Sequence, residues 1–234
     1  MIFSTKCYYK PSFTGRYGSL KNSHKEATAW FDGLYKANRE SKEKIPWARH
    51  EVNPLLKGYL ENKKPKGDES KRALVIGCGL GDDAKALEDA GYQVVAIDVA
   101  QSALDLAQEK FPDSTIRFEK QDIFEMPKEY CEYFDFVFEA FTIQSLPVEF
   151  RERMVEAIVN TVAPKGELLV VAHKREKHFD GPPWPLEEIE MAMFQEHGLE
   201  TLFYEIYQEE SAISKNFFNV LYHKPESSCK QLTQ

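Results

Sequence analysis

The sequence predicts an α/β fold: a doubly wound sheet of seven strands, mostly parallel with a reversed C-terminal strand, preceded by a helical N-terminal extension. Two observations predict this fold. From residue 73 onward, short runs rich in Val, Ile and Phe alternate with amphipathic helical stretches, which is typical of βαβ units. After residue 197, two strand-like runs follow one another without a crossover helix, so we expect an antiparallel pair to finish the sheet.

The N-terminal extension contains an arm and two helices. Residues 1–22 show no periodicity and predict an irregular arm. Apolar residues then recur at helical spacing from Ser23 to about Glu40, and Ser23 with Glu26 forms a candidate capping box. A second helix is expected through Val52–Leu60, and the charged run 61–72 predicts a solvated connector.

The remaining elements follow from the same patterns. The expected strands are Ala73–Ile76, Gln93–Asp98, Thr115–Glu119, Phe134–Glu139, Glu167–Ala172, Thr201–Tyr207 and Asn216–Tyr222. The expected helices are Asp82–Ala90, Ala100–Lys110, Val148–Val162 and Leu186–His197. Pro164 and Gly166 are a common stop signal after the third of these helices.

Composition limits the function. The formal net charge of −8 disfavours nucleic acid as a partner, because phosphate binding needs concentrated Lys and Arg. No apolar run resembles a signal peptide or approaches the roughly 18 residues that cross a bilayer, so no membrane partner is expected. The four cysteines lack CxxC spacing, which favours reduced thiols and a cytoplasmic location without a zinc site or disulfides.

A glycine turn between a strand and a helix is the strongest functional signal. The strand Ala73–Ile76 runs into Gly77-Cys78-Gly79-Leu80-Gly81, and a helix starts directly afterwards. Glycines let the backbone turn sharply and approach a ligand closely. Asp98 ends the next strand, where a carboxylate can accept hydrogen bonds from both hydroxyls of a ribose. The two features together favour a nucleoside site over a simple turn followed by a helix cap.

The charge beside the turn indicates which nucleoside binds. A dinucleotide fingerprint requires a third glycine at position 82, but this chain has Asp82 followed by Asp83. Two carboxylates repel a pyrophosphate, whereas a ligand with a sulfonium and an ammonium group tolerates them. Asp82 is equally compatible with an ordinary helix N-cap. An NAD-dependent oxidoreductase is therefore the less favoured interpretation.

At this point the chain resembles class I S-adenosylmethionine-dependent methyltransferases, whose fold is Rossmann-like. The resemblance implies that Gly77, Cys78, Gly79 and Gly81 lie under the methionine part of the cofactor, and that Asp98 and the adjacent Val99 border its ribose. It also implies that Asp122 and Ile123 contact the adenine, and that Glu139 and Ala140 border the transferred methyl group. Asp82 is included among the cofactor-binding residues, and S-adenosylhomocysteine is the implied product.

Two further patterns are similar to the thiopurine and thiol methyltransferase branch. One is Trp30-x-x-x-Leu34-Tyr35 followed by Ile45-Pro46-Trp47, which that branch folds over its cofactor. Trp30 and Trp47 are the candidate contacts; helix packing is an equally good interpretation for Trp30 and a weaker one for Trp47, which lies beside a proline on a predicted loop. The other is Gly181-Pro182-Pro183-Trp184, similar to a loop near the substrate. The expected domains are a cofactor-covering segment at 1–70, a methyltransferase domain at 71–225 and a tail at 226–234.

The expected reaction is methylation of a small molecule, and the acceptor atom stays open. Candidate acceptor-site residues are Arg49, His50, Phe141, Arg175 and Trp184, with Lys174 as a further cation; a cation would stabilise a thiolate. A thiol needs no dedicated base, whereas Glu139 and His173 are candidate bases for an amine or hydroxyl acceptor; for His173 a structural strand-end role is the commoner interpretation. No metal site is expected, and the alternatives are N- or O-methylation or a non-catalytic module that binds the cofactor. The protein is expected to be a monomer or a homodimer.

Overall fold

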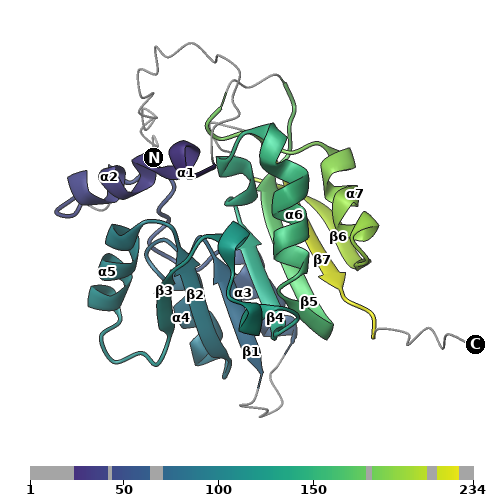
Figure 1. Cartoon of the computed structure of the whole chain (residues 1–234), viewed down its shortest axis with the longest axis horizontal. Helices are drawn as coiled ribbons and strands as arrows, with labels where there is room; N and C mark the ends of the chain where they lie inside the picture. The colour runs from purple at the N-terminus through teal and green to yellow at the C-terminus, as the bar shows by residue number, and fades with distance from the viewer. Residues whose placement is uncertain (1–23, 42–43, 64–70, 178–180, 210–214, 227–234) are drawn as a thin grey trace, which may run out of the picture.

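The computed structural model describes residues 24–41, 44–63, 71–177, 181–209 and 215–226. Its seven strands form one sheet in the order β3-β2-β1-β4-β5-β7-β6 (Figure 1). The strands are β1 (Arg72–Ile76), β2 (Gln93–Asp98), β3 (Arg117–Lys120), β4 (Phe134–Ala140), β5 (Val162–His173), β6 (Glu200–Gln208) and β7 (Asn216–His223). Strands β1 to β5 pair in parallel, and β7 runs antiparallel to both β5 and β6. The predicted doubly wound sheet with a reversed C-terminal strand is confirmed.

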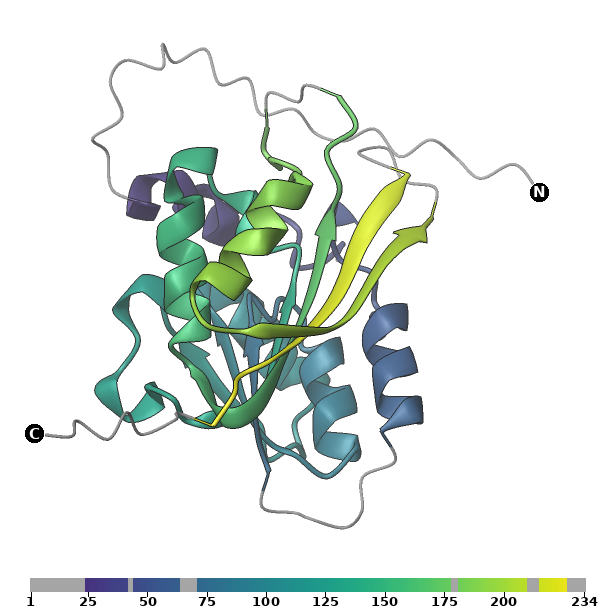
Figure 2. The same cartoon turned by 90° about the vertical axis from the view of Figure 1, so that its right-hand side faces the viewer.

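The helices cover both faces of the sheet, as the edge-on view in Figure 2 shows. They are α1 (His24–Thr28), α2 (Trp30–Ala37), α3 (Pro54–Asn62), α4 (Asp82–Asp89), α5 (Gln101–Lys110), α6 (Arg151–Val159) and α7 (Glu188–Glu196). One core cluster packs α3, α4 and α5 against the sheet, and a second packs α6 and α7 against the opposite face. Helix α2 lies on α5 at one end of the sheet. Short 3-10 turns, η2 (Ile123–Glu125), η3 (Lys128–Tyr130), η4 (Ile143–Ser145) and η5 (Val148–Phe150), follow β3 and β4.

The first predicted helix is two helices in the structure, which corrects the expected range of 23–40. The hydroxyl of Thr28 donates to the carbonyl oxygen of His24 at 3.2 Å, and the indole N–H of Trp30 donates to that of Ala27 at 3.0 Å. Side chains that bond to helix carbonyls compete with the helical ladder, and α1 ends at Thr28. Ser23 of the predicted capping box lies outside the described residues, as do the arm 1–22 and most of the connector.

Other boundaries also differ from the prediction; the helix expected at Val52–Leu60, for example, is α3 at Pro54–Asn62. The expected helix 148–162 is η5 followed by α6, and β5 begins already at Val162. The predicted stop signal, Pro164 and Gly166, lies inside β5. The register of β5 against β4 jumps from Phe134↔Val162 to Phe136↔Glu167, so the residues between Val162 and Glu167 form a bulge. Helix α7 begins at Glu188 rather than at Leu186, since Glu187 and Glu190 form a reciprocal capping box there. The third strand starts at Arg117, two residues later than expected.

Within the described ranges, no helix combines the length and the apolar character that crossing a membrane requires.

Candidate active site

The glycine turn joins β1 to α4 at the edge of the sheet where the parallel strands end. Gly77 has φ +64, and a Cβ there would lie 2.2 Å from Oγ1 of Thr142, whose hydroxyl donates to the carbonyl oxygen of Ile76 at 3.0 Å. Gly79 has φ +53, and a Cβ there would lie 3.1 Å from the hydroxyl of Tyr35. The turn is therefore a close-packed cradle: a side chain at position 77 would clash with Thr142, and the left-handed backbone and the nearby Tyr35 hydroxyl disfavour one at position 79. Burial raises the pKa of the Cys78 thiol well above its usual value, so this thiol stays protonated.

Asp98 connects the end of β2 to the glycine turn. Its Oδ2 accepts a hydrogen bond from the backbone N–H of Gly79 at 3.0 Å, and its Oδ1 accepts one from that of Ala100 at 2.9 Å. Burial raises the pKa of this carboxyl to about 6, against the lowering effect of these backbone donors. A carboxylate has about four lone-pair sites, so Asp98 can still accept from a ligand hydroxyl in addition to its backbone donors. Val99, the next residue, is half-buried in the turn before α5.

The two acidic residues that begin α4 are both engaged by the protein. Asp82 forms an ion pair with Lys110 of α5 at 2.5 Å, and Asp83 accepts a hydrogen bond from the backbone N–H of Asn53 at 2.7 Å. The N-cap of α4 is Gly81, so the N-cap role considered for Asp82 is wrong. Burial raises the pKa of Asp83 to about 6. Position 82 carries an aspartate where a dinucleotide-binding turn has its third glycine. In the structure this aspartate is the ion-pair partner of Lys110.

An aromatic cluster from the N-terminal extension covers the glycine turn. The indole N–H of Trp47 donates to the hydroxyl of Tyr35 at 2.8 Å, and Tyr35 is buried against Gly79. Trp30 stacks on Phe31 with ring centroids 4.1 Å apart and meets Trp47 edge-on at 5.7 Å. Both predicted tryptophans therefore lie in one cluster, and each has a packing role there. Tyr35, which stood in the predicted aromatic pattern but not among the candidate contacts, reaches closest to the turn.

Asp122 and Ile123 follow β3, the strand next to β2. Ile123 is buried in the core. Asp122 accepts a hydrogen bond from the backbone N–H of Phe124 at 3.0 Å, and its other oxygen lies 2.7 Å from Nε2 of His24 in α1. No motif of the sequence singled out His24, because its partner is 98 positions away.

The end of β4 is held by a fully buried carboxyl group. Oε1 of Glu139 accepts hydrogen bonds from the backbone N–H groups of Thr142 and Ile143, both at 2.7 Å. Oε2 is buried and has no partner among the residues that the structure describes. Burial raises the pKa of Glu139 to about 7. Ala140 is half-buried, and Phe141 adopts φ +65, a left-handed conformation that is uncommon for an aromatic residue and typical of functional sites.

We expect the Glu139→Gln variant to gain stability relative to the unaltered protein as the pH rises. The pKa of Glu139 is about 7 in the folded state, above its ordinary value of 4.5, so its contribution is complete below about pH 4.5 and is lost as the pH rises through 7. Glutamine keeps the acceptor for Thr142 and Ile143 and does not titrate. Urea unfolding at pH 5.5 and 8 is expected to shift the difference in free energy of unfolding by about 2 kcal/mol in favour of the variant. A difference that stays constant with pH would contradict this assignment.

His173 forms one wall of the site at the end of β5. Its ring lies 5.2 Å from that of Phe141 and 4.5 Å from that of Phe217 on β7, measured between centroids. Nδ1 is buried and has no partner within the described part of the chain. Burial, with a smaller effect of the Arg49 charge, lowers the pKa of His173 to about 4, so the imidazole is neutral at pH 7. Phe217 was not among the predicted residues, since nothing in the sequence placed β7 beside β5.

The predicted acceptor-site residues fall into two groups. Arg49 forms a 2.8 Å ion pair with Glu209 at the end of β6 and is close enough to affect the pKa of His173. His50 is exposed next to it, with φ +59. Arg175, by contrast, is paired with Glu187 at 2.8 Å, and Lys174 with Glu188. Arg49 is thus the predicted cation that the structure brings to the His173 wall.

A buried ion pair holds the loop that carries Trp184. Arg151 of α6 pairs with Glu190 of α7 at 3.0 Å and donates to the carbonyl oxygens of Ile143 at 2.6 Å and Trp184 at 3.0 Å. The backbone N–H of Trp184 in turn donates to the carbonyl oxygen of Gln144 at 2.6 Å. Trp184 is therefore held against η4, the turn that follows β4. No sequence pattern indicated Arg151, which holds this loop in place.

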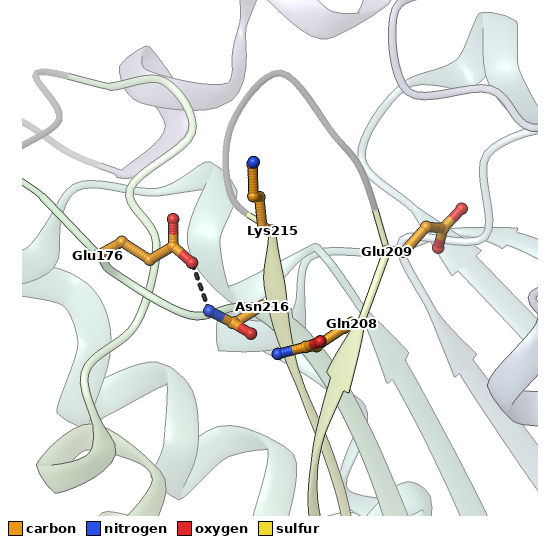
Figure 3. A pocket seen from close by; sticks show the side chains of 5 residues that line it. All are labelled: Glu176, Gln208, Glu209, Lys215 and Asn216. Atoms are coloured by element: carbon orange, nitrogen blue, oxygen red, sulfur yellow. Dashed lines mark hydrogen bonds between the residues drawn. The ribbon is translucent and has the colours of Figure 1, made fainter.

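A cavity of about 300 Å³ lies where β6 ends and β7 begins (Figure 3). It is lined by Glu176, Gln208, Glu209, Lys215 and Asn216. Glu176 and Asn216 point toward each other and are hydrogen-bonded, whereas Glu209, which pairs with Arg49, turns away from them. The lining is polar and carries both signs of charge, in contrast to the aromatic wall formed by Phe141 and Phe217.

Comparison with known proteins places the chain among methyltransferases. The family model for thiopurine S-methyltransferase matches residues 36–227. Thiocyanate methyltransferase 1 of Arabidopsis thaliana is 29% identical over 156 residues, which are 64% of this chain and 65% of that protein. The thiopurine S-methyltransferase of Shewanella loihica is 25% identical over 63% of this chain and 72% of its own length. The N-methyltransferase NodS of Bradyrhizobium japonicum, solved with S-adenosylhomocysteine, shares the fold with a TM-score of 0.66 at 19% identity, over 82% of this chain and 98% of that one.

Proposed function

The chain belongs to the thiopurine S-methyltransferase family, and on this premise we propose that it is an S-adenosylmethionine-dependent methyltransferase acting on a small molecule with a soft nucleophile, most simply a thiol. The observation that carries the proposal is the hydrogen bond from Gly79 to Asp98, which joins the glycine cradle to a buried carboxylate under an aromatic cover. The matched region spans 65% of the length of the thiocyanate methyltransferase from Arabidopsis thaliana.

The residues at the strand ends fit the cofactor. The glycine turn, Asp98 and Asp122 follow β1, β2 and β3, which are neighbours in the sheet, so they form a row that suits the amino-acid part, the ribose and the base of one nucleoside ligand. The proposed cofactor contacts are Trp30, Trp47, Gly77, Cys78, Gly79, Gly81, Asp82, Asp98, Val99, Asp122, Ile123, Glu139 and Ala140. When bound, S-adenosylmethionine supplies an activated methyl group and a good leaving group.

The acceptor is proposed to lie against Phe141, His173 and Phe217. The aromatic rings suit an apolar or planar acceptor, and the neutral His173 offers Nδ1 as a hydrogen-bond acceptor for an S–H group. A lone pair of the acceptor sulfur forms the new S–CH₃ bond while the sulfonium S–CH₃ bond breaks, and the thiol proton passes to His173 or to solvent. The chain's main contribution is to align the two sulfur atoms and to exclude water.

The first experiment measures methyl transfer from labelled S-adenosylmethionine to panels of thiols, amines and hydroxyl compounds. Faster transfer to thiols supports the proposal, and faster transfer to amines or hydroxyls would replace it with N- or O-methylation. Micromolar binding of S-adenosylhomocysteine without transfer to any panel would favour a non-catalytic binding module. Absence of cofactor binding would overturn the proposal.

We expect Arg49→Gln to lower kcat/KM for a thiol by about tenfold and to raise the apparent pKa on the acid side of its pH profile. An unperturbed thiol has a pKa of about 8.5, and a nearby cation favours the thiolate. The charge-matched control is Arg117→Gln, because Arg117 is exposed and starts β3 at the opposite end of the sheet. Equal profiles for the two variants would exclude Arg49 from this role.

We further propose a cytoplasmic location, because the cysteines in the described part of the chain, Cys78 and Cys131, are both free thiols.

A further inference from the structure

Helix α1 is attached to the segment that follows β3. The ring of His24 lies 4.5 Å from that of Phe124 and 6.3 Å from that of Phe150, between centroids. Lys25 forms an ion pair with Glu125 at 2.5 Å, and Ala27 packs against the core. The first described helix is therefore docked over η2, directly beside Asp122.

The contact between His24 and Asp122 is buried. Nε2 of His24 lies 2.7 Å from Oδ2 of Asp122, and the two side chains are 8% and 16% exposed. Oδ1 accepts from the backbone N–H of Phe124, so the carboxylate is held through both oxygens. A carboxylate that accepts a hydrogen bond on each of its two oxygens has a fixed orientation. Its remaining lone pairs can bind only another hydrogen-bond donor.

We infer that His24 is a positioning residue that makes Asp122 selective for a 6-aminopurine. This inference rests on the proposed function, in which Asp122 receives the base of the cofactor. Adenine presents an N–H₂ donor at position 6, and a fixed carboxylate oxygen accepts it. A 6-oxopurine presents a carbonyl oxygen there, which the same carboxylate repels. By holding Oδ2, His24 prevents Asp122 from turning away from the base or presenting a different edge to it.

The simpler alternative is that His24 only anchors α1. Anchoring would affect every ligand under the N-terminal cover equally, whereas positioning of Asp122 affects only the contact with position 6 of the purine. The two roles therefore differ in the ratio of affinities for two cofactors that are identical except at that position.

The test is calorimetric binding of S-adenosylhomocysteine and of its 6-oxo analogue, S-inosylhomocysteine, to the full chain. We expect His24→Phe to reduce the preference for the amino form by about tenfold, mainly by weakening S-adenosylhomocysteine, because one charge-assisted hydrogen bond no longer orients Asp122. His24→Gln, whose amide can still donate to Asp122, is expected to keep most of the preference. Lys25→Gln is the matched control, since it removes the neighbouring ion pair of α1 with Glu125 and leaves both hydrogen bonds of the Asp122 carboxylate in place.

Equal weakening of both ligands in His24→Phe would overturn the inference and leave His24 as an anchor of α1. An unchanged preference in His24→Phe would also overturn it. If the unaltered protein binds neither ligand, the proposed function itself fails, and this outcome is distinguishable because it does not depend on the variants.

Discussion

Replacing Asp98 by alanine is expected to weaken binding of S-adenosylhomocysteine by at least about 100-fold, which corresponds to about 2.7 kcal/mol. The substitution removes the carboxylate proposed to accept both ribose hydroxyls, and each charge-assisted hydrogen bond contributes about 1.5–3 kcal/mol. It also releases the N–H of Gly79, so the cradle keeps only the bond from the backbone N–H of Cys78 to the carbonyl oxygen of Ile97 as a described hydrogen bond to β2. Titration calorimetry on the purified variant measures the loss directly.

Stability must be measured alongside this binding experiment. Asp98→Ala leaves the buried N–H groups of Gly79 and Ala100 without their acceptor, which costs about 1–3 kcal/mol for each buried polar group left unpaired. The control is Asp89→Asn, because Asp89 is an exposed residue at the other end of α4 and pairs with Lys85. Micromolar binding by a folded Asp98→Ala variant would show that β2 does not hold the ribose.

Local patterns predicted the fold because the residues that indicate each strand or helix lie within that element or directly beside it in the sequence. The strand and helix runs from β1 to α5 were placed to within two residues at each end, since a short apolar run bounded by Gly, Asp or Pro leaves little choice. The errors lie where tertiary pairing overrides local signals. Pro164 and Gly166 read as a stop, yet pairing with β4 and β7 draws this segment into β5 as a bulge.

The sequence placed candidate site residues side by side only where they belong to the same βαβ unit. The glycine turn and Asp98 belong to one βαβ unit, and the structure adds a hydrogen bond between Gly79 and Asp98, 19 positions apart, that the sequence did not predict. The sequence did not indicate His24 or Phe217, because each contacts a residue that is far away along the chain. Arg175 and Arg49 were equivalent candidates by residue type, and the structure separates them by their ion-pair partners.

The largest loss of stability is expected for Arg151→Met, at about 3–5 kcal/mol, because removing one member of a buried ion pair leaves the other charge without compensation. The cation nearest to Glu190 would then be Arg175, 3.7 Å away, and the carbonyl oxygens of Ile143 and Trp184 would lose the hydrogen bonds from Arg151. Urea unfolding followed by circular dichroism measures the change. Arg153→Met is the matched control, since Arg153 is exposed on the same helix and lies over the ring of Phe124, away from Glu190.

A double variant separates the cost of an unpaired charge from the loss of the bridge itself. Glu190→Gln removes the charge and keeps an oxygen that can accept from the backbone N–H of Glu187, as Glu190 does at 2.7 Å. If the unpaired carboxylate causes most of the loss, Arg151→Met combined with Glu190→Gln should be more stable than Arg151→Met alone, with a coupling energy of about 1–3 kcal/mol. If the two substitutions simply add, the important contacts are instead those of Arg151 to Ile143 and Trp184. In that case the arginine stabilises the fold chiefly by tying the end of β4 to the Trp184 loop, and weaker acceptor binding should accompany the loss of stability.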